Sequence, residues 1–266
     1  MTAEIVERVL RSSRYRDVDR SLLSRLATEE LARARNTDDA VKRVKRRLHQ
    51  AVGAFRGSSR HTELAEVWNG DLIDPAFRAA CADALRAHAS TRERLPHLDG
   101  FYGAIWDHTG MPRSLLDLGC GLNPLALPWM GIGQAEYIAI DVDRRTLATV
   151  ESFMTMVGQP YRIEARDFVS NPPTEPADVA LLLKLVTTLD RQGAQAATRL
   201  IRTLDVRHAV VSFAARSLGG RGKGMERTYR DRMERLAADV GRVSAVGEAS
   251  VRNELVFVLT LDPVDG

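Results

Sequence analysis

Leu115-Leu-Asp-Leu-Gly-Cys-Gly-Leu-Asn-Pro124 gives the clearest indication of how this chain folds, together with the run Tyr137-Ile-Ala-Ile-Asp141 that follows it. The first apolar run ends at Gly119 and Gly121, where the backbone can adopt a positive φ and approach a ligand with no Cβ between them. The second run ends in Asp141, a carboxylate placed to accept hydrogen bonds from ribose hydroxyls, as in dinucleotide-binding folds. Because Pro124 replaces the third glycine of the dinucleotide fingerprint, the pattern predicts a nucleotide-sized pocket of a different kind.

This glycine turn, which Asp117 precedes, resembles motif I of the S-adenosylmethionine-dependent methyltransferases. Their cofactor has no pyrophosphate, so the turn need only admit a ribose and an amino acid tail. A strand, a glycine turn and a helix are common in other α/β proteins, so the turn alone does not establish a function. The acidic residue that ends the next apolar run favours a methyltransferase with S-adenosylmethionine as its cofactor.

The pattern of the chain changes after Arg113. Short apolar runs then alternate with amphipathic segments, which is typical of a parallel sheet with crossover helices. Strands are expected at residues 114–118, 137–140, 161–165, 179–183, 209–213, about 242–248 and 255–261. No helix fits between the last two, so these should form an antiparallel hairpin. The predicted fold is an α/β, seven-stranded, Rossmann-like class I methyltransferase sheet preceded by an all-helical N-terminal module.

Ligands of an open α/β sheet bind beyond the carboxyl ends of its strands. Three further residues stand at such positions: Asp167 and Phe168 follow the third predicted strand, and Lys184 follows the fourth. Asp167 could simply cap the next helix, but in this fold its position faces the adenine amino group, and Phe168 could pack on the adenine ring. We therefore expect both to bind the cofactor beside the glycine turn.

Charge is divided unevenly along the chain. The net charge is +3 over 266 residues, yet residues 1–60 hold 15 Lys and Arg against 8 Asp and Glu. This basic end favours a polyanionic partner. No apolar run approaches the ~20 residues of a membrane span and the N-terminus lacks a signal-peptide pattern, so we expect a cytoplasmic protein with no membrane partner. Two cysteines, Cys81 and Cys120, offer neither a disulfide framework nor a metal cluster, and no metal is expected.

The basic end is predicted to be helical. Thr37 can cap a helix whose apolar residues, from Val41 to Phe55, recur at spacings of three and four. Five cations occupy its other faces: Lys42, Arg43, Lys45, Arg46 and Arg47. Ordinary solvated helix faces mix charges, so this density favours contact with nucleic acid over a merely solubilising surface.

Further helices are expected near residues 3–12, 19–35 and 75–89. We accordingly divide the chain into a basic, helical, RNA-binding module at residues 1–105 and a methyltransferase domain at residues 106–266. A second basic stretch runs from Arg216 to Arg232 and includes Arg221 and Lys223 among four glycines. It suits an RNA-binding loop that becomes ordered on phosphate, although a plain surface loop explains the composition almost as well.

The segment Ser90-Thr-Arg-Glu-Arg94 has the form of a capping box, in which Ser90 and Glu93 bond to the backbone, but a capping box leaves Arg94 unexplained. Five segments together resemble, in order and spacing, the aminoglycoside-resistance methyltransferases of 16S ribosomal RNA, and among them the branch that modifies guanine N7 in the decoding-site helix. These segments are Ser90-Thr-Arg-Glu-Arg-Leu-Pro-His-Leu-Asp99, Gly119-Cys-Gly-Leu-Asn-Pro-Leu-Ala126, Leu181-Leu-Leu-Lys184, Lys223-Gly-Met225 and Asn253-Glu-Leu255.

The resemblance implies a function and several residue roles. Arg94 would bind the cofactor carboxylate, Asp141 the ribose and Asp167 the adenine, while Lys184 and Glu254 would line the target pocket as catalytic residues. The substrate would be a guanine, by resemblance nucleotide 1405, in 16S rRNA of the assembled 30S ribosomal subunit, and its methylation would confer aminoglycoside resistance. Two positions depart from the family pattern: Leu122, where some members carry an aromatic residue, and Ala214-Ala-Arg216.

The target atom can also be considered from chemistry alone. Enzymes that methylate exocyclic amines usually carry an Asn or Asp, Pro, Pro, aromatic motif after the fourth strand, and the partial match Asn171-Pro-Pro-Thr174 lies before that strand and lacks the aromatic residue. Carbon methylation of pyrimidines typically needs a cysteine nucleophile, and Cys120 is better explained as a small filler of the glycine turn. Guanine N7 carries no proton, so alignment and exclusion of water suffice. A methyltransferase for a neighbouring base and a non-catalytic RNA-binding assembly factor are the alternatives.

Overall fold

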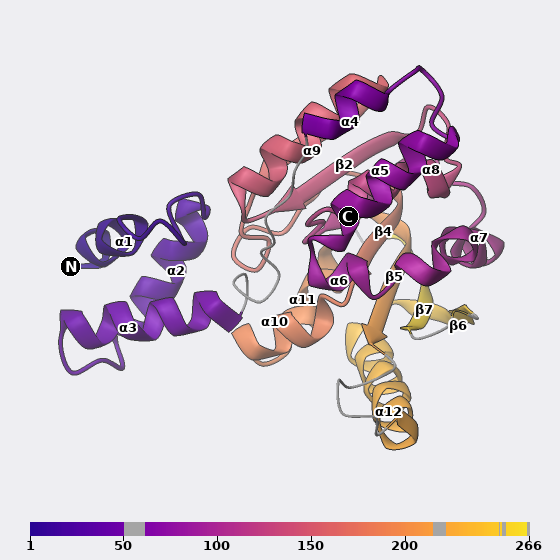
Figure 1. The fold of residues 1–266 in the computed structure, drawn as a ribbon. Helices are drawn as coiled ribbons and strands as arrows, with labels where there is room; N and C mark the ends of the chain where they lie inside the picture. Colours follow the sequence, from indigo (N-terminus) through magenta and orange to yellow (C-terminus); the bar gives the residue numbers. More distant parts are fainter. Residues whose placement is uncertain (51–61, 215–221, 250, 252–253, 265–266) are drawn as a thin grey trace.

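The N-terminal end folds as three helices around an apolar core of its own. The computed structural model describes residues 1–266 except 51–61, 215–221, 250, 252–253 and 265–266. Helices α1 (Thr2–Leu10), α2 (Arg20–Leu31) and α3 (Thr37–Leu48) bury a cluster that includes Ile5, Leu23 and Val44. Figure 1 shows these helices as a separate unit beside the rest of the molecule. We refer to residues 1–48 as the N-terminal module.

The cap of α3 differs from the sequence prediction by one residue. The side chain of Asn36, not Thr37, accepts a hydrogen bond from the backbone N–H of Asp39 at 2.9 Å. Asn and Thr can both cap a helix, and the extended backbone at Asn36 places its amide oxygen over the free N–H groups of the first turn. The part of the predicted helix beyond Gln50 lies outside the described residues.

A second group of helices packs on the sheet. It comprises α4 (Thr62–Val67), α5 (Pro75–Arg86), α6 (Ala89–Arg92), the short 3-10 helix η2 (Leu95–His97) and α7 (Leu98–Thr109). Phe77 and Phe101 from these helices share one apolar core with the strand residues Tyr137 and Val179. These helices fall within the predicted module at residues 1–105, and their apolar side chains are buried against the sheet.

Seven strands form one sheet in the order β3-β2-β1-β4-β5-β7-β6. They are β1 (Ser114–Leu118), β2 (Glu136–Asp141), β3 (Tyr161–Ala165), β4 (Ala177–Leu183), β5 (Val206–Ala214), β6 (Val243–Ala249) and β7 (Glu254–Leu261). The first five are parallel, and β7 runs antiparallel to both β5 and β6. This topology confirms the predicted class I methyltransferase fold and its terminal hairpin.

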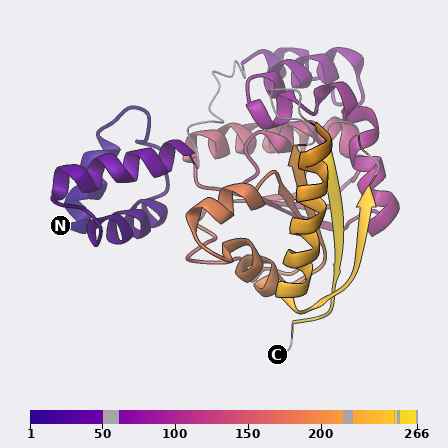
Figure 2. The same ribbon diagram turned by 90° about the horizontal axis from the view of Figure 1, so that it is seen from below.

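Helices cover both faces of the sheet, as Figure 2 shows. Alternation along β1 explains the two layers, since Leu115 packs toward α5, α7 and α9 (Arg144–Val157), while Leu116 and Leu118 pack toward the other face. That face is covered by α10 (Val186–Gln192), α11 (Ala196–Thr203) and α12 (Gly222–Val240). The short helices η3 (Asn123–Ala126) and α8 (Leu127–Met130) follow the glycine turn.

The expected loop at 216–232 is a helix from Gly222 onward. Met233, Leu236 and Val240 recur at helical spacing and are buried, and the ring of Tyr229 stacks on Phe213 at 4.6 Å between centroids. Burial of this apolar stripe outweighs the low helix propensity of the glycines at its start. No helix in the described part of the chain is both long enough and apolar enough to cross a membrane.

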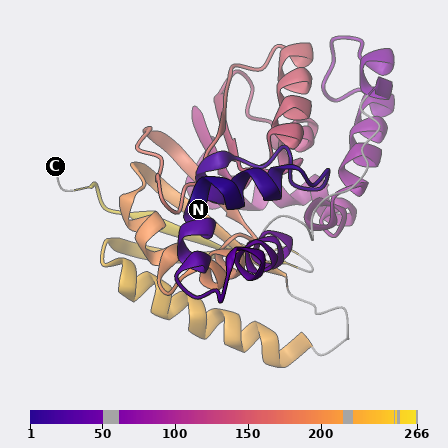
Figure 3. The ribbon, with the colours of Figure 1, turned by 90° about the vertical axis from the view of Figure 1, so that its left-hand side faces the viewer.

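The N-terminal module lies over the carboxyl ends of β2 and β3 (Figure 3). The backbone N–H of Asp19 donates to the carbonyl of Val142 at 2.8 Å, and Val18 forms a β-bridge with Asp143 just beyond β2. The guanidinium of Arg144 also donates to the Asp19 carboxylate at 2.7 Å. These contacts bring the module to the edge of the sheet at which ligands of this fold class bind.

Candidate functional site

The glycine turn follows β1 and requires glycine at two positions. Gly119 has φ 65° and Gly121 has φ 50°, both in the left-handed region. A Cβ at Gly119 would lie 3.1 Å from the Leu185 side chain, and one at Gly121 would lie 3.1 Å from the His88 ring. The backbone is therefore open to a ligand here, while a side chain would both strain the turn and crowd it. Cys120 is buried in the turn, and burial raises the pKa of its thiol, which suits a filler rather than a nucleophile.

One pocket gathers most of the residues that the sequence analysis assigned to the cofactor. Gly119, Gly121, Asp141, Asp167 and Phe168 all line it, and Lys184 does so as well. Its other walls are contributed by Leu22, His88, Ser90, Val142, Asp143, Thr146, Val169, Leu183, Leu185, Thr188 and Gln192, of which Ser90 and Leu183 lie in segments that carried the family resemblance. Leu22 comes from α2, so the N-terminal module forms part of the pocket.

Asp141 ends β2 and faces the glycine turn. One of its carboxylate oxygens accepts the N–H of Gly121 and the other accepts the N–H of Asp143, each at 2.9 Å. Burial raises the pKa of Asp141, although these two N–H groups act in the opposite direction. A carboxylate can accept about four hydrogen bonds, so the two oxygens retain capacity for the hydroxyls of a ribose.

Asp167 and Phe168 follow β3 and are both buried. The Asp167 carboxylate is bonded to Arg25 of α2, to the Ser170 hydroxyl and to the Val169 N–H. Phe168 belongs to the apolar cluster beneath β1 and β2 and reaches the pocket wall. Both residues therefore line the pocket, and the Asp167 carboxylate is bound there by Arg25.

Arg94 lies in a buried network next to the pocket. Its guanidinium donates to the Glu254 carboxylate at 2.8 and 3.2 Å and to the Asn123 side-chain oxygen at 2.9 Å, and it lies 4.2 Å from the Phe101 ring centroid. Burial disfavours the Glu254 carboxylate, but the positive charges of Arg94 and Lys184 outweigh burial and lower the pKa of Glu254. Glu254 is therefore an anion that holds two cations.

Lys184 follows β4 with φ 56°, an unusual backbone conformation for a residue with a side chain. Its ammonium donates to the Glu93 carboxylate at 2.7 Å and to the Ser90 carbonyl at 3.1 Å, and it lies 3.7 Å from Glu254. The helix at this segment begins at Ala89 with His88 at its N-cap, and Glu93 binds Lys184, so the capping-box interpretation of 90–94 is wrong. The Ser90 hydroxyl pairs with the His88 ring at 2.8 Å instead.

A further polar cluster beneath the glycine turn was not found from the sequence. The Asp117 carboxylate accepts bonds from the Tyr137 hydroxyl at 2.6 Å and the Asn123 amide at 3.0 Å, and Tyr102 donates to Asn123 at 2.8 Å. Burial raises the pKa of Asp117 to about 6, against the effect of these hydrogen bonds. Asn123 bonds to both Arg94 and Asp117, so it connects the cluster to the Glu254 network. In the sequence, Asn123 was distinguished only by its place in the glycine motif.

The chain matches the family described as Ribosomal RNA methyltransferase (FmrO) over residues 11–258. The protein belongs to this family. A 16S rRNA (guanine(1405)-N(7))-methyltransferase of Micromonospora echinospora is 38% identical over 263 residues, covering 96% of this chain and 95% of the relative. One of Frankia casuarinae is 39% identical over 266 residues, covering 95% and 91%. The crystal structure of the 16S rRNA methyltransferase RmtF with S-adenosyl-L-homocysteine matches with a TM-score of 0.84 at 34% identity, over 98% of both chains.

In this FmrO-family protein the cations of α3 divide into two groups. Arg43 and Arg47 turn toward α2, where both pair with Glu30, and Arg47 also donates to the Gln192 carbonyl at 3.1 Å. Of the five predicted RNA-binding cations of α3, the structure therefore leaves Lys42 and Arg46 exposed and Lys45 half-buried, while Arg43 and Arg47 are paired with α2. Of the others, Arg216 and Arg221 lie outside the described residues, and Lys223 is in the first turn of α12.

No set of three or more His, Cys, Asp and Glu side chains in the described ranges is arranged to hold a metal ion.

Proposed function

We propose that this protein transfers a methyl group from S-adenosylmethionine to N7 of guanine 1405 of 16S rRNA in the assembled 30S subunit, and that this methylation confers resistance to aminoglycosides that bind the decoding-site helix. The observation that carries the proposal is one pocket, lined by the glycine turn, Asp141, Asp167 and Lys184, in a chain with 38% identity to a guanine(1405)-N7 methyltransferase. The substrate implies that the enzyme acts in the cytoplasm.

The residues of the pocket fit S-adenosylmethionine. The open backbone at Gly119 and Gly121 admits the ribose and the amino acid tail, Asp141 accepts from the ribose hydroxyls, and Asp167 and Phe168 bind the adenine. When bound, the cofactor supplies an electrophilic methyl group on a sulfonium. The protein holds this group and a purine nitrogen in line and excludes water from both.

Arg94 has a second task in this proposal besides its bond to Glu254. The described contacts of its guanidinium use three of the five N–H groups that an arginine carries. Tyr102 also interacts with the guanidinium, and the cofactor carboxylate is proposed to take an N–H group that these partners leave. Glu254 keeps the guanidinium in one orientation from behind, so that this contact needs no rearrangement of Arg94.

Lys184 and Glu254 define the side of the pocket that receives the base. The Lys184 ammonium can donate to guanine O6, which shares an edge of the base with N7. Glu254 lies 3.7 Å from that ammonium and fixes its position, together with Glu93. N7 carries no proton, so neither residue is needed as a general base.

The exposed cations of α3 are the proposed RNA contacts of the N-terminal module. A base in a folded RNA helix has to leave its stack to reach a pocket, which costs a few kcal/mol. Phosphate contacts from Lys42, Lys45 and Arg46 can offset this cost. Arg216, Arg221 and Lys223 are proposed to act in the same way near the start of α12.

The proposal is tested by mapping the methyl group. Purified protein is incubated with unmethylated 30S subunits and isotopically labelled S-adenosylmethionine, and the 16S rRNA is digested and analysed by mass spectrometry. We expect label on N7 of guanine 1405 and none on free 16S rRNA. Label on a neighbouring base would redirect the proposal, and no label with intact 30S binding would identify a non-catalytic binding protein.

A further inference from the structure

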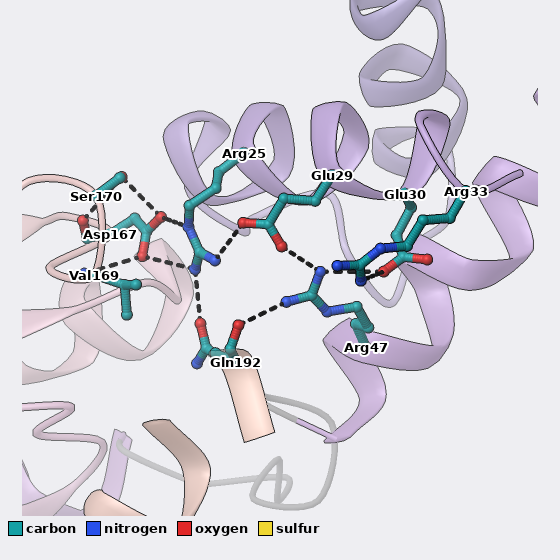
Figure 4. A network of polar contacts seen from close by, with 9 residues as sticks. All are labelled: Arg25, Glu29, Glu30, Arg33, Arg47, Asp167, Val169, Ser170 and Gln192. Carbon is teal, nitrogen blue, oxygen red and sulfur yellow. Dashed lines mark hydrogen bonds and ion pairs between the residues drawn. The ribbon is translucent and has the colours of Figure 1, made fainter. Parts of the chain in front are cut away.

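Arg25 of α2 binds the carboxylate that is proposed to recognise adenine. Its Nε lies 2.6 Å from one Asp167 oxygen, and a terminal guanidinium nitrogen lies 3.1 Å from the other. Both side chains are largely shielded from solvent, with 14% of Arg25 and 3% of Asp167 exposed. Figure 4 shows this contact between the N-terminal module and the loop after β3. A bidentate, charge-assisted pair of this kind is among the stronger polar contacts in proteins.

With the contact to Arg25, the Asp167 carboxylate accepts four hydrogen bonds. The oxygen that binds Arg25 Nε also accepts the Ser170 hydroxyl at 2.9 Å, and the other oxygen also accepts the Val169 N–H at 3.3 Å. An ionised carboxylate offers about four acceptor positions, and four donors already occupy them. Val169 donates through a backbone N–H that the turn fixes, and the Ser170 hydroxyl lies in the same turn, where it also donates to the Asp167 carbonyl at 3.3 Å. Of these donors, Arg25 is the one that comes from the N-terminal module.

The guanidinium of Arg25 also binds residues of α2 and α10, where the N-terminal module contacts α10. It donates to Gln192 at 2.7 Å and to Glu29 at 3.2 Å. Arg47 of α3 repeats the arrangement, because it pairs with Glu29 and Glu30 and donates to the Gln192 carbonyl (Figure 4). One network of hydrogen bonds and ion pairs therefore connects Asp167 to α2 and α3, so the hydrogen bonds that Asp167 makes depend on where the N-terminal module sits.

We propose that Arg25 is an autoinhibitory latch: its guanidinium and the adenine 6-amino group compete for Asp167, so that cofactor binding opposes the docked position of the N-terminal module. The inference rests on the proposed role of Asp167 in adenine binding. Coupling between two sites is reciprocal. Whatever draws the module away from Asp167, including RNA bound to its exposed cations, therefore raises the affinity for cofactor.

The test compares two arginines of the same helix. Arg25→Gln removes the latch, and Arg20→Gln is the matched control, because Arg20 lies on α2 and pairs with Glu7 inside the module. Binding of S-adenosylhomocysteine is measured by calorimetry. We expect Arg25→Gln to bind more tightly than wild type, within the about 5- to 150-fold range typical of coupled sites. Arg20→Gln should bind as wild type does. Equal or weaker binding by Arg25→Gln overturns the latch.

Arg25→Lys provides a second variant that keeps the charge. A lysine cannot form the bidentate contact, so its affinity should fall between those of wild type and Arg25→Gln. Hydrogen exchange of the α2 amides gives a readout that does not depend on affinity. Addition of S-adenosylhomocysteine should raise exchange across residues 20–31 of the wild type, and slower exchange there would also overturn the proposal.

Failure of the latch and failure of the adenine assignment are distinguishable. Asp167→Asn is placed in the Arg25→Gln background, where no latch operates. Weaker binding of S-adenosylhomocysteine in this double variant supports the role of Asp167 in adenine binding, whatever Arg25→Gln does alone. Unchanged binding removes that role, and the latch with it.

Discussion

Glu254→Gln is the substitution that tests the buried charge network most directly. The Glu254 side chain is 4% exposed and its partner Arg94 is 3% exposed, and the two are joined by hydrogen bonds at 2.8 and 3.2 Å. The Ser212 hydroxyl donates to the same carboxylate, and Lys184 lies 3.7 Å away. Glutamine keeps the volume and one acceptor oxygen but removes the negative charge, so Arg94 remains buried without its counter-ion.

The structure sets the size of the effect. Removing one partner of a buried ion pair costs about 3 to 5 kcal/mol, because the other charge is left uncompensated. We expect a value near the lower end, since the glutamine oxygen can still accept one bond from Arg94. For a protein of this size, about 3 kcal/mol corresponds to a fall in Tm of roughly 6 to 12 °C.

The assay is thermal unfolding of wild type and variant from pH 8 to pH 3. The pKa of Glu254 is lowered in the folded state, so its contribution is complete above its ordinary value of 4.5 and is lost as the pH falls through the folded value. The Tm difference should therefore be constant from pH 8 to about pH 5 and shrink below that.

Glu93→Gln is the matched control for this experiment. Glu93 also binds Lys184, but its side chain is 51% exposed, and exposed pairs contribute at most about 1 kcal/mol. A Tm for Glu254→Gln no lower than that of Glu93→Gln at neutral pH would refute the argument, as would a Tm difference from wild type that grows on acidification.

Three further outcomes concern the cofactor, the base and the RNA. Asp141→Ala should lose two charge-assisted bonds to ribose hydroxyls, each worth on the order of 1.5 to 3 kcal/mol, and unchanged S-adenosylmethionine affinity in calorimetry would reject the assignment. Lys184→Ala should lower single-turnover methylation with little change in cofactor affinity. The wild-type rate should be nearly flat between about pH 6.5 and 8.5, because N7 has no proton to remove, and a tenfold rise per pH unit would require a base and another target atom. Charge reversal of Lys42, Lys45 and Arg46 to Glu should abolish 30S binding and spare cofactor affinity, and wild-type binding should weaken steeply with salt. Normal 30S binding by that variant would make this surface merely solubilising.

Much of the sheet could be predicted because its signals are local. The first, second and fourth predicted strands are largely apolar runs bounded by polar or glycine residues. The third, Tyr161–Ala165, alternates apolar and charged residues and begins and ends where it was expected. The helix after Gly222 was missed because glycines among arginines suggest a loop. The apolar side chains between Tyr229 and Val240 stabilise this helix only in the folded protein, where Phe213 and the hairpin bury them.

The candidate site also has features that a short stretch of sequence can predict and others that depend on residues far apart in the chain. The glycine turn and Asp141 follow from backbone and hydrogen-bonding requirements that a short stretch can express. The charge partners do not, because Arg94 and Glu254 are 160 positions apart and Arg25 and Asp167 are 142 apart. The sequence also allowed Ser90 and Glu93 to form a capping box, whereas Lys184 offers Glu93 a full charge that a backbone N–H does not.

The type of fold, the place of the glycine turn and the basic character of the N-terminal end could be predicted from the amino acids alone, since they depend on periodicity, glycine and net charge within a few tens of residues. Which cations face solvent and which are bound depends on how α2 packs against α3. Helical periodicity predicts that Val44 is buried and Lys42 exposed, but it does not predict that Arg47 is bound by carboxylates while Arg46 is exposed. That difference arises because α2 brings Glu29 and Glu30 to one side of α3, where a charge leaving water needs a partner of opposite sign.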